Sequence, residues 1–229
     1  YAIKHGHFDK SLITVKNDDG SVALDREEFP RPGTTLESLA GLDTVFDKFM
    51  GVPIDETGET FDQLVKRAYP DLAINHVHHA GNSSGVVDGA AALIMSSKEY
   101  ASAQGWKPRA RVRAIATVGG SPTLMLNEPV PAARKVLERA GMTTNDIDLF
   151  EVNEAFSVVA AKFIRDLALD PAIVNVNGGA MALGHPIGAT GSILIGTALD
   201  ELERRDLNTA LITMCTGGGM APAIIIERV

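Results

Sequence analysis

The hydrophobic and polar positions divide this chain into two stretches of different pattern. Up to about residue 83, hydrophobic positions are scattered and show no regular alternation of strands and helices. Within this stretch we predict a hairpin formed by residues 11–16 and 21–25, and short helices at residues 36–40 and 61–68. The stretch is therefore expected to be an irregular domain that lies outside the layered core of the fold.

Beyond residue 90, short hydrophobic runs alternate with helical patterns. Predicted strands occupy residues 90–96, 109–118, 148–152, 173–176, 210–215 and 223–228, and predicted helices occupy residues 98–104, 131–140, 154–167 and 187–204. This alternation is typical of an α/β sheet that is covered on both faces. The last two strands have no helix between them, so we expect them to pair antiparallel and make the sheet mixed.

Composition narrows the classes of function open to the chain. The net charge of −8 argues against a general nucleic-acid binder, which presents a basic face. No hydrophobic run approaches the roughly 18 residues that a membrane-spanning helix needs. Cys215 is the only cysteine among the 229 residues, so no disulfide can form within the chain and a reducing, cytoplasmic location is expected.

The first residues resemble the end of a helix. Tyr1 begins a run that could form a last helical turn, and Gly6 stands where a C-cap is expected. Because a helix tail without a beginning indicates that sequence precedes it, we expect this chain to be part of a longer polypeptide.

Four polar or glycine-rich segments lie where a predicted strand ends or a predicted helix begins. They are residues 81–85, 153–156, 178–191 and 215–219. In open α/β sheets, binding sites form at the carboxyl ends of strands. These segments are therefore the candidate site.

His185 lies between Gly184 and Pro186, ahead of a predicted helix. The proline fixes the backbone, and the neighbouring glycines allow a ligand to approach closely. An imidazole held in this way can act as a base or as an oxyanion-hole donor. A single histidine in a loop more often has only a capping or packing role, so His185 alone leaves both interpretations open.

Cys215 and Asn153 each follow a predicted strand. A buried cysteine is most often inert, but one beside three glycine N–H groups is well placed to be a stabilised thiolate. Those glycine N–H groups are also candidate oxyanion donors. Asn153 stands at the beginning of a predicted helix, where simple capping is the ordinary role of an asparagine.

Two other sites are disfavoured by spacing. Gly184, Gly188 and Gly191 do not form a dinucleotide-binding G-x-G-x-x-G pattern, and no Lys-Ser/Thr follows them as a phosphate-binding loop requires. The histidines within residues 76–79 have no acidic or cysteine partner at ligand-like spacing, so no metal site is expected. Residues 66–67, Lys-Arg, are a possible contact for phosphates, although a solvated helix face is the better explanation of them.

Taken together, the segments resemble the thiolase family. Asn-Glu-Ala-Phe at 153–156, Gly-Gly-Ala-Met-Ala-Leu-Gly-His-Pro-Ile-Gly-Ala-Thr-Gly at 178–191 and Cys-Thr-Gly-Gly-Gly-Met at 215–220 occur in the order and approximate spacing of that family. The segment at 80–85, followed by Asp-Gly-Ala-Ala at 88–91, is similar to the family's upstream coenzyme A-contacting stretch. Ketosynthases and hydroxymethylglutaryl-CoA synthases share the fold but differ around the histidine and nucleophile, and are distant alternatives.

The resemblance implies a catalytic role for four residues. His185 would deprotonate a nucleophilic cysteine and help stabilise the first oxyanion. Asn153 would hold the water that completes that oxyanion hole. Cys215 would move the proton on the α-carbon of acetyl-CoA, and the N–H of Gly217 would contribute to a second oxyanion hole.

The resemblance also implies the substrate and the fold. Coenzyme A thioesters would be substrates, with Ser84 facing the pantetheine, Met125 lining its tunnel and no further cofactor. The layered α-β-α-β-α fold of the family would be present here as a mixed five-stranded C-terminal half. Residues 1–85 would be a partial loop domain that covers coenzyme A, residues 86–105 the last strand and helix of the N-terminal core, and residues 106–229 the C-terminal core.

One departure from the family concerns the nucleophile. The family's acyl-accepting cysteine precedes the loop domain, whereas the only cysteine here matches the proton-transfer position. We therefore expect a fragment of an acetyl-CoA acetyltransferase or 3-ketoacyl-CoA thiolase of fatty-acid metabolism, inactive by itself, whose partners are its N-terminal half and further copies in a homodimer or homotetramer. A subunit of a split thiolase and a non-catalytic thiolase-like protein that binds coenzyme A or lipid are the alternatives.

Overall fold

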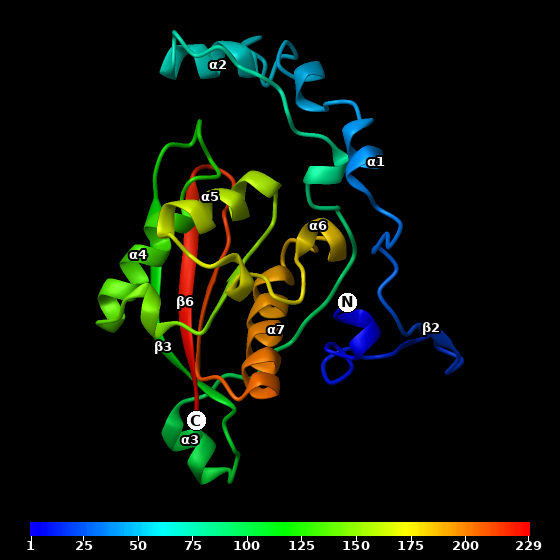
Figure 1. Cartoon of the computed structure of the whole chain (residues 1–229), viewed down its shortest axis with the longest axis vertical. Coiled ribbons are helices and arrows are strands. Elements are labelled where there is room, and N and C mark those ends of the chain that lie inside the picture. The colour runs from blue at the N-terminus through cyan, green and yellow to red at the C-terminus, as the bar shows by residue number, and fades with distance from the viewer.

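In the computed structural model, which describes all residues 1–229, a four-stranded mixed sheet occupies the centre of the molecule (Figure 1). Its strands are β3 (Ala110–Gly119), β4 (Leu149–Val152), β5 (Thr209–Thr213) and β6 (Met220–Arg228), in the spatial order β3-β6-β5-β4. β6 is antiparallel to both of its neighbours, and β4 is parallel to β5. The predicted mixed sheet, with its last two strands antiparallel, is confirmed.

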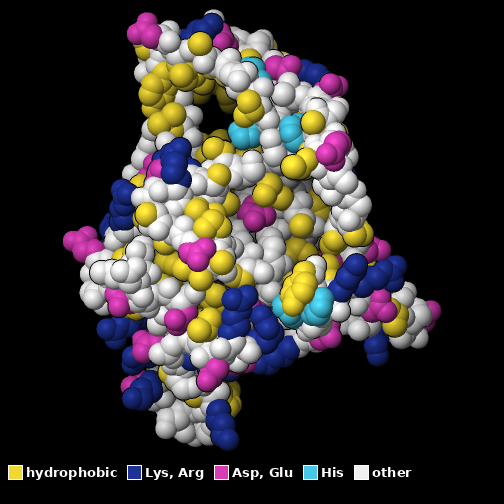
Figure 2. All heavy atoms as spheres, viewed as in Figure 1, with side chains coloured by type: hydrophobic (Ala, Val, Ile, Leu, Met, Phe, Trp, Pro, Cys, Tyr) yellow, Lys and Arg dark blue, Asp and Glu magenta, His cyan; other side chains and the backbone are white.

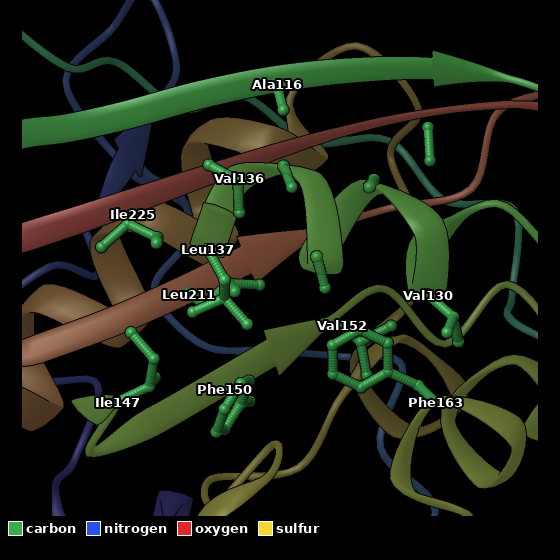
Figure 3. Close-up of a cluster of buried hydrophobic side chains, with 14 of the residues drawn as sticks. Ala116, Val130, Val136, Leu137, Ile147, Phe150, Val152, Phe163, Leu211 and Ile225 are labelled. Atoms are coloured by element: carbon green, nitrogen blue, oxygen red, sulfur yellow. The ribbon is translucent and has the colours of Figure 1, made fainter. Parts of the chain in front are cut away.

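Helices cover both faces of this sheet. Helices α4 (Pro129–Ala140) and α5 (Ser157–Leu167) pack on one face, and α7 (Thr190–Arg205) packs on the other. Consecutive strand residues point to opposite faces, so Phe150 belongs to the cluster under α4 and α5, whereas Leu149 belongs to the cluster under α7. Phe150 meets Phe163 of α5 edge to face, with ring centroids 6.1 Å apart (Figure 3).

The fifth strand predicted at residues 173–176 is wrong. A 3-10 helix, η5 (Pro171–Ile173), occupies its start, and a single bridge joins Val174 to β4. Asn175 has a positive φ of 46°, which turns the backbone out of an extended path. Its side chain instead receives the Val152 N–H at 2.8 Å and donates to the Val152 carbonyl at 2.9 Å, so an amide group replaces the backbone of a strand.

The buried strand predicted at residues 90–96 is also wrong. These residues pair with no strand of this chain, and Ile94 and Met95 are 86% and 70% exposed. A hydrophobic run forms a strand only where another backbone pairs with its hydrogen-bonding groups. Helix α3 (Lys98–Ala103) follows the run and is confirmed.

Residues 1–105 pass around the outside of the layered part (Figure 1). Among them only Ala2 and Ala101 are buried. Figure 2 shows an opening, edged by hydrophobic side chains, between the segment that carries α2 and the rest of the molecule. The elements here are η1 (Ile3–His5), β1 (Val15–Lys16), β2 (Val22–Leu24), α1 (Leu36–Ala40), η2 (Phe46–Lys48), α2 (Phe61–Ala68) and η3 (Ala80–Asn82).

Several predicted boundaries move. Helix α4 begins at Pro129, two residues early, because a proline suits the first helical position. The segment predicted as one helix from residue 187 instead remains a loop up to α7, after the short helix α6 (Ala180–Leu183). Between α4 and β4 lies η4 (Thr144–Asp146). No helix of the structure combines the length and the hydrophobicity needed to cross a membrane.

Basic side chains of α4 cover the free edge of the sheet. Lys135 donates to the carbonyl of Thr117 at 2.9 Å, and Arg139 donates to the carbonyl of Ile115 at 2.7 Å. Both carbonyls belong to β3, which pairs only with β6. Charged side chains on an edge strand hinder the addition of a further strand.

Candidate active site

Two neighbouring parallel strands bring the predicted site residues to one edge of the sheet. β4 and β5 run side by side in register, with Val152 opposite Thr213. Asn153 follows β4 directly, and its N–H donates to the Thr213 carbonyl at 3.0 Å. Cys215 lies two residues beyond the end of β5. Asn153 and Cys215 therefore both lie at the carboxyl ends of adjacent strands, as the sequence predicted.

His185 reaches this edge from the loop before α7. Its Nε2 lies 3.4 Å from Nδ2 of Asn153, and its Nδ1 lies 2.7 Å from the buried hydroxyl of Thr190. The His185 N–H also donates to the Gly85 carbonyl at 2.8 Å. Partial burial lowers the pKa of His185 because it disfavours the charged imidazolium. Both ring nitrogens thus have a polar neighbour, the backbone N–H of His185 ties its loop to Gly85, and the imidazole is neutral at physiological pH, the form that accepts a proton.

Glu154 connects two of the sequence motifs. Its Oε1 accepts from Nδ2 of Asn175 at 2.9 Å, and its Oε2 accepts from the N–H of Met181 at 3.2 Å. A Cβ added at Gly179 would lie only 2.3 Å from the Glu154 carboxyl carbon. The carboxylate therefore occupies the space that glycine leaves, and it fixes the loop that leads into His185.

The glycines after Cys215 form the turn between β5 and β6. Thr216 and Met220 close this turn by exchanging backbone hydrogen bonds of 2.8 and 3.3 Å. The N–H of Gly217 is exposed and donates to no protein atom. A donor left free at the turn is what an oxyanion hole needs.

Cys215 itself is a buried thiol, only 7% exposed. Burial raises its pKa, and a backbone hydrogen bond opposes that effect only in part. The sequence interpretation of Cys215 as a stabilised thiolate therefore does not match its surroundings in this structure. The protonated thiol, which can donate a proton, is the dominant form at neutral pH.

We expect Cys215 to react with iodoacetamide only at alkaline pH. Since the thiolate is the reactive form and burial raises the pKa, the midpoint of alkylation should exceed the roughly 8.5 of an unperturbed cysteine. Mass spectrometry of the folded chain across a pH series measures it, and the urea-unfolded chain is the control. A folded-state midpoint at or below the unfolded one would contradict this prediction.

The two predicted coenzyme A contacts occupy different loops near this edge. Ser84 lies beside the Asn153 segment, because its N–H donates to the Ala155 carbonyl at 3.0 Å. Met125 lies in the loop after β3, with its N–H bonded to the Ser121 carbonyl at 3.0 Å. That carbonyl lies close against Gly219, where a Cβ would be 2.5 Å from it. The loop of Met125 thus packs on the Cys215 turn.

Sequence reasoning missed Thr190 and Glu151 as parts of the site. Thr190 lay inside the 178–191 segment and the predicted helix at 187–204 without being assigned a role, and Glu151 was an interior residue of the predicted strand at 148–152. The histidines at residues 76–79 have other partners: His78 lies against Phe156 with ring centroids 4.8 Å apart, and Nδ1 of His79 accepts from the Gly81 N–H. The structure contains no group of three histidine, cysteine or acidic side chains arranged to hold a metal.

Comparisons with known proteins support the same reading of the motifs. A family model described as the C-terminal domain of thiolase matches residues 106–228. An acetyl-CoA acetyltransferase of Paracoccus denitrificans is 40% identical over 229 residues, which cover 99% of this chain and 52% of that protein. The chain thus spans about half the length of the curated relatives it matches.

Two solved structures extend the likeness to the fold. The acetyl-CoA acetyltransferase of Bacillus anthracis superposes with a TM-score of 0.83 at 34% identity, covering 100% of this chain and 52% of that one. Human mitochondrial 3-ketoacyl-CoA thiolase in complex with CoA gives 0.79 at 31% identity, covering 100% and 51%. The α/β fold predicted from the sequence is thus shared with both.

Proposed function

The chain belongs to the thiolase family, and from this premise we propose that it supplies the proton-transferring half of an acyltransferase acting on acyl-CoA thioesters. The reaction is thiolytic cleavage of a 3-ketoacyl-CoA or its reverse, the Claisen condensation of acetyl-CoA. The observation that carries the proposal is the contact between Asn153 and His185. This contact lies at the carboxyl ends of β4 and β5, the parallel strands that precede Asn153 and Cys215. The acyl-accepting cysteine comes from a segment outside these 229 residues.

His185 and Asn153 serve the first half of the cleavage. The neutral imidazole takes the proton of the acyl-accepting thiol, whose sulfur then attacks the 3-keto carbonyl. The carbonyl oxygen becomes an oxyanion, which His185 and a water held by Asn153 stabilise. The carbon–carbon bond then breaks, and its electron pair passes to the α-carbon of the departing acetyl-CoA.

Cys215 completes that step by donating its thiol proton to the α-carbon. The raised pKa of Cys215 favours this direction, because it keeps the thiol protonated at neutral pH. In the condensation direction Cys215 must instead remove the α-proton as a thiolate. Coenzyme A finally loses its thiol proton to the Cys215 thiolate, and its sulfur attacks the acyl thioester while the free N–H of Gly217 stabilises the oxyanion formed there. The bond between the acyl carbon and the accepting cysteine then breaks, and that cysteine sulfur leaves and takes back the proton held by His185.

The proposal includes the surroundings of the site. Ser84 faces the pantetheine and Met125 lines its tunnel, with no cofactor besides the coenzyme A thioester. Residues 1–85 act as the covering domain, residues 86–105 as part of the N-terminal core and residues 106–229 as the C-terminal core. We further propose a homodimer or homotetramer in the cytoplasm that serves fatty-acid metabolism.

The test joins this chain to an acyl-accepting segment. The chain is fused behind the amino-terminal half of the Paracoccus denitrificans relative, and the fusion is termed the assembled enzyme below. We expect it to cleave acetoacetyl-CoA in a reaction that requires coenzyme A, whereas neither part alone should do so, because covalent catalysis needs both halves. Product acetyl-CoA is measured by chromatography, and folding is checked by circular dichroism.

Two outcomes would count against the proposal. A folded fusion that binds coenzyme A without cleaving acetoacetyl-CoA would favour the non-catalytic binding protein. Cleavage by the 229-residue chain alone would show that the second cysteine is not needed. As a matched control, the unmodified Paracoccus denitrificans enzyme sets the activity to be expected of a complete site.

A further inference from the structure

Two polar atoms without hydrogen-bond partners belong to residues that are two apart in sequence and line one cavity. Oε2 of Glu151 and Oδ1 of Asn153 are both buried without a partner in the protein. Residues two apart on a strand share a face, and both line a cavity of about 30 Å³ that Thr190 and Thr197 of α7 also line. Such a volume can hold one water molecule. Buried polar atoms are normally hydrogen-bonded, so this pair points to an unassigned bridging group.

The charges around Glu151 favour its neutral form. Glu151 is 2% exposed, and burial, followed by the nearby carboxylates of Glu154 and Glu201, raises its pKa well above the usual range. Burial acts on Glu201 as well, but hydrogen bonds from Arg204, Asn177 and Arg205 lower the pKa of Glu201 to about 2. The cations therefore neutralise Glu201 and leave none for Glu151.

The neutral carboxyl can supply the donor that Oδ1 of Asn153 needs. An amide oxygen can only accept, whereas a protonated carboxyl can donate. The opposite end of the same amide, Nδ2, lies 3.4 Å from Nε2 of His185. Fixing Oδ1 therefore fixes which end of the amide faces the imidazole.

We propose that Glu151 is a positioning residue for the reaction proposed above: in its protonated form it donates, through one water molecule in the cavity, to Oδ1 of Asn153 and so keeps Nδ2 directed at His185. The titratable groups near Glu151 are Glu154, Glu201 and the two arginines bonded to Glu201. His185 is also close, on the other side of the Asn153 amide. His7 is one step further away, bonded to Asn177. The inference depends on the proposed function only for its catalytic consequence.

The protonation state is tested independently of catalysis by infrared spectroscopy of the assembled enzyme. At pH 7–8 we expect a carbonyl-stretch band of a protonated carboxyl that disappears in Glu151→Gln. The band should persist in Glu203→Gln, the matched control, because Arg109 and Lys10 hold the pKa of Glu203 at about 2 and Glu203 is not among the groups that shift the pKa of Glu151. Absence of the band in the unmodified protein, or its persistence in Glu151→Gln, would overturn the proposal.

The positioning role is tested by the imidazole signals and by kinetics. Glu151→Gln keeps a donor of the same size, so the ¹⁵N resonances of His185 and kcat should stay close to the original values. Glu151→Leu removes the donor, so we expect shifted His185 resonances and a fall in kcat of up to about 100-fold, with KM little changed. Unchanged His185 resonances in a folded Glu151→Leu variant would overturn the proposal, even if the assembled enzyme proved inactive.

Discussion

Replacing His185 by alanine in the assembled enzyme is expected to lower turnover by at least about 100- to 1,000-fold. Loss of one oxyanion-hole donor costs on that order, or about 2.7–4 kcal/mol, and loss of the base adds to it. The structure supports both roles, because the ring is neutral, lies 3.4 Å from Nδ2 of Asn153 and is held by Thr190. The measurement is kcat for thiolysis of acetoacetyl-CoA.

Two further variants separate the roles of His185. His185→Gln retains an N–H donor without a base, so its activity should lie between those of the alanine variant and the original protein. His5→Ala serves as the matched control, since His5 is exposed and bonded only to the backbone of Tyr1. Near-normal thiolysis by a folded His185→Ala variant would refute the assignment.

Replacing Cys215 by serine is expected to separate acyl transfer from carbon–carbon bond chemistry. A hydroxyl is a far weaker acid and base than a thiol at neutral pH, and loss of a general acid or base costs typically 10²–10⁴-fold, or about 3–5 kcal/mol. Condensation and cleavage should fall by about that factor. Acylation of the other cysteine should persist, because in the proposed mechanism Cys215 does not carry the acyl group.

Mass spectrometry after incubation with acetyl-CoA, followed by peptide mapping, decides this point. Acetyl found on Cys215 in the unmodified protein would reverse the assignment of the two cysteines. Normal condensation by Cys215→Ser would reduce the thiol to a packing residue. Cys215→Ala is the companion variant, because it removes the donor altogether and should behave like the serine variant.

The middle of the sheet could be predicted because β4 and β5 are buried on both faces. Such strands are continuous hydrophobic runs, as in the fully buried β5, and their pattern does not depend on distant partners. The two strands that were predicted wrongly depend on contacts that the local sequence does not show. Residues 90–96 have the same texture but pair with no strand here, and the backbone at Asn175 leaves the strand path while its side chain makes the contacts.

The site could be predicted as far as strand ends determine it. Asn153 and Cys215 lie at the same edge because the parallel strands that precede them end there, which the sequence indicates. The contacts of His185 with Thr190 and of Glu154 with the backbone at Met181 depend on loop geometry, which no periodic pattern encodes. Glu151 could not be identified from the sequence because the raised pKa that marks it depends partly on Glu201. Glu201 lies fifty residues later in the chain, in the helix layer that covers the sheet.

The backbone at residues 83–86 has a thermodynamic consequence for the site. Ser83 bridges to Phe156 and Val86 bridges to His185, so one short segment ties the loop of Asn153 to the loop of the imidazole. A ligand that bound at Ser84 and stabilised this segment would also favour the aligned imidazole. By linkage, alignment would raise affinity for that ligand by the same factor. Occupancy of a site at Ser84 and alignment of the imidazole would thereby be coupled through the two bridges, Ser83 to Phe156 and Val86 to His185.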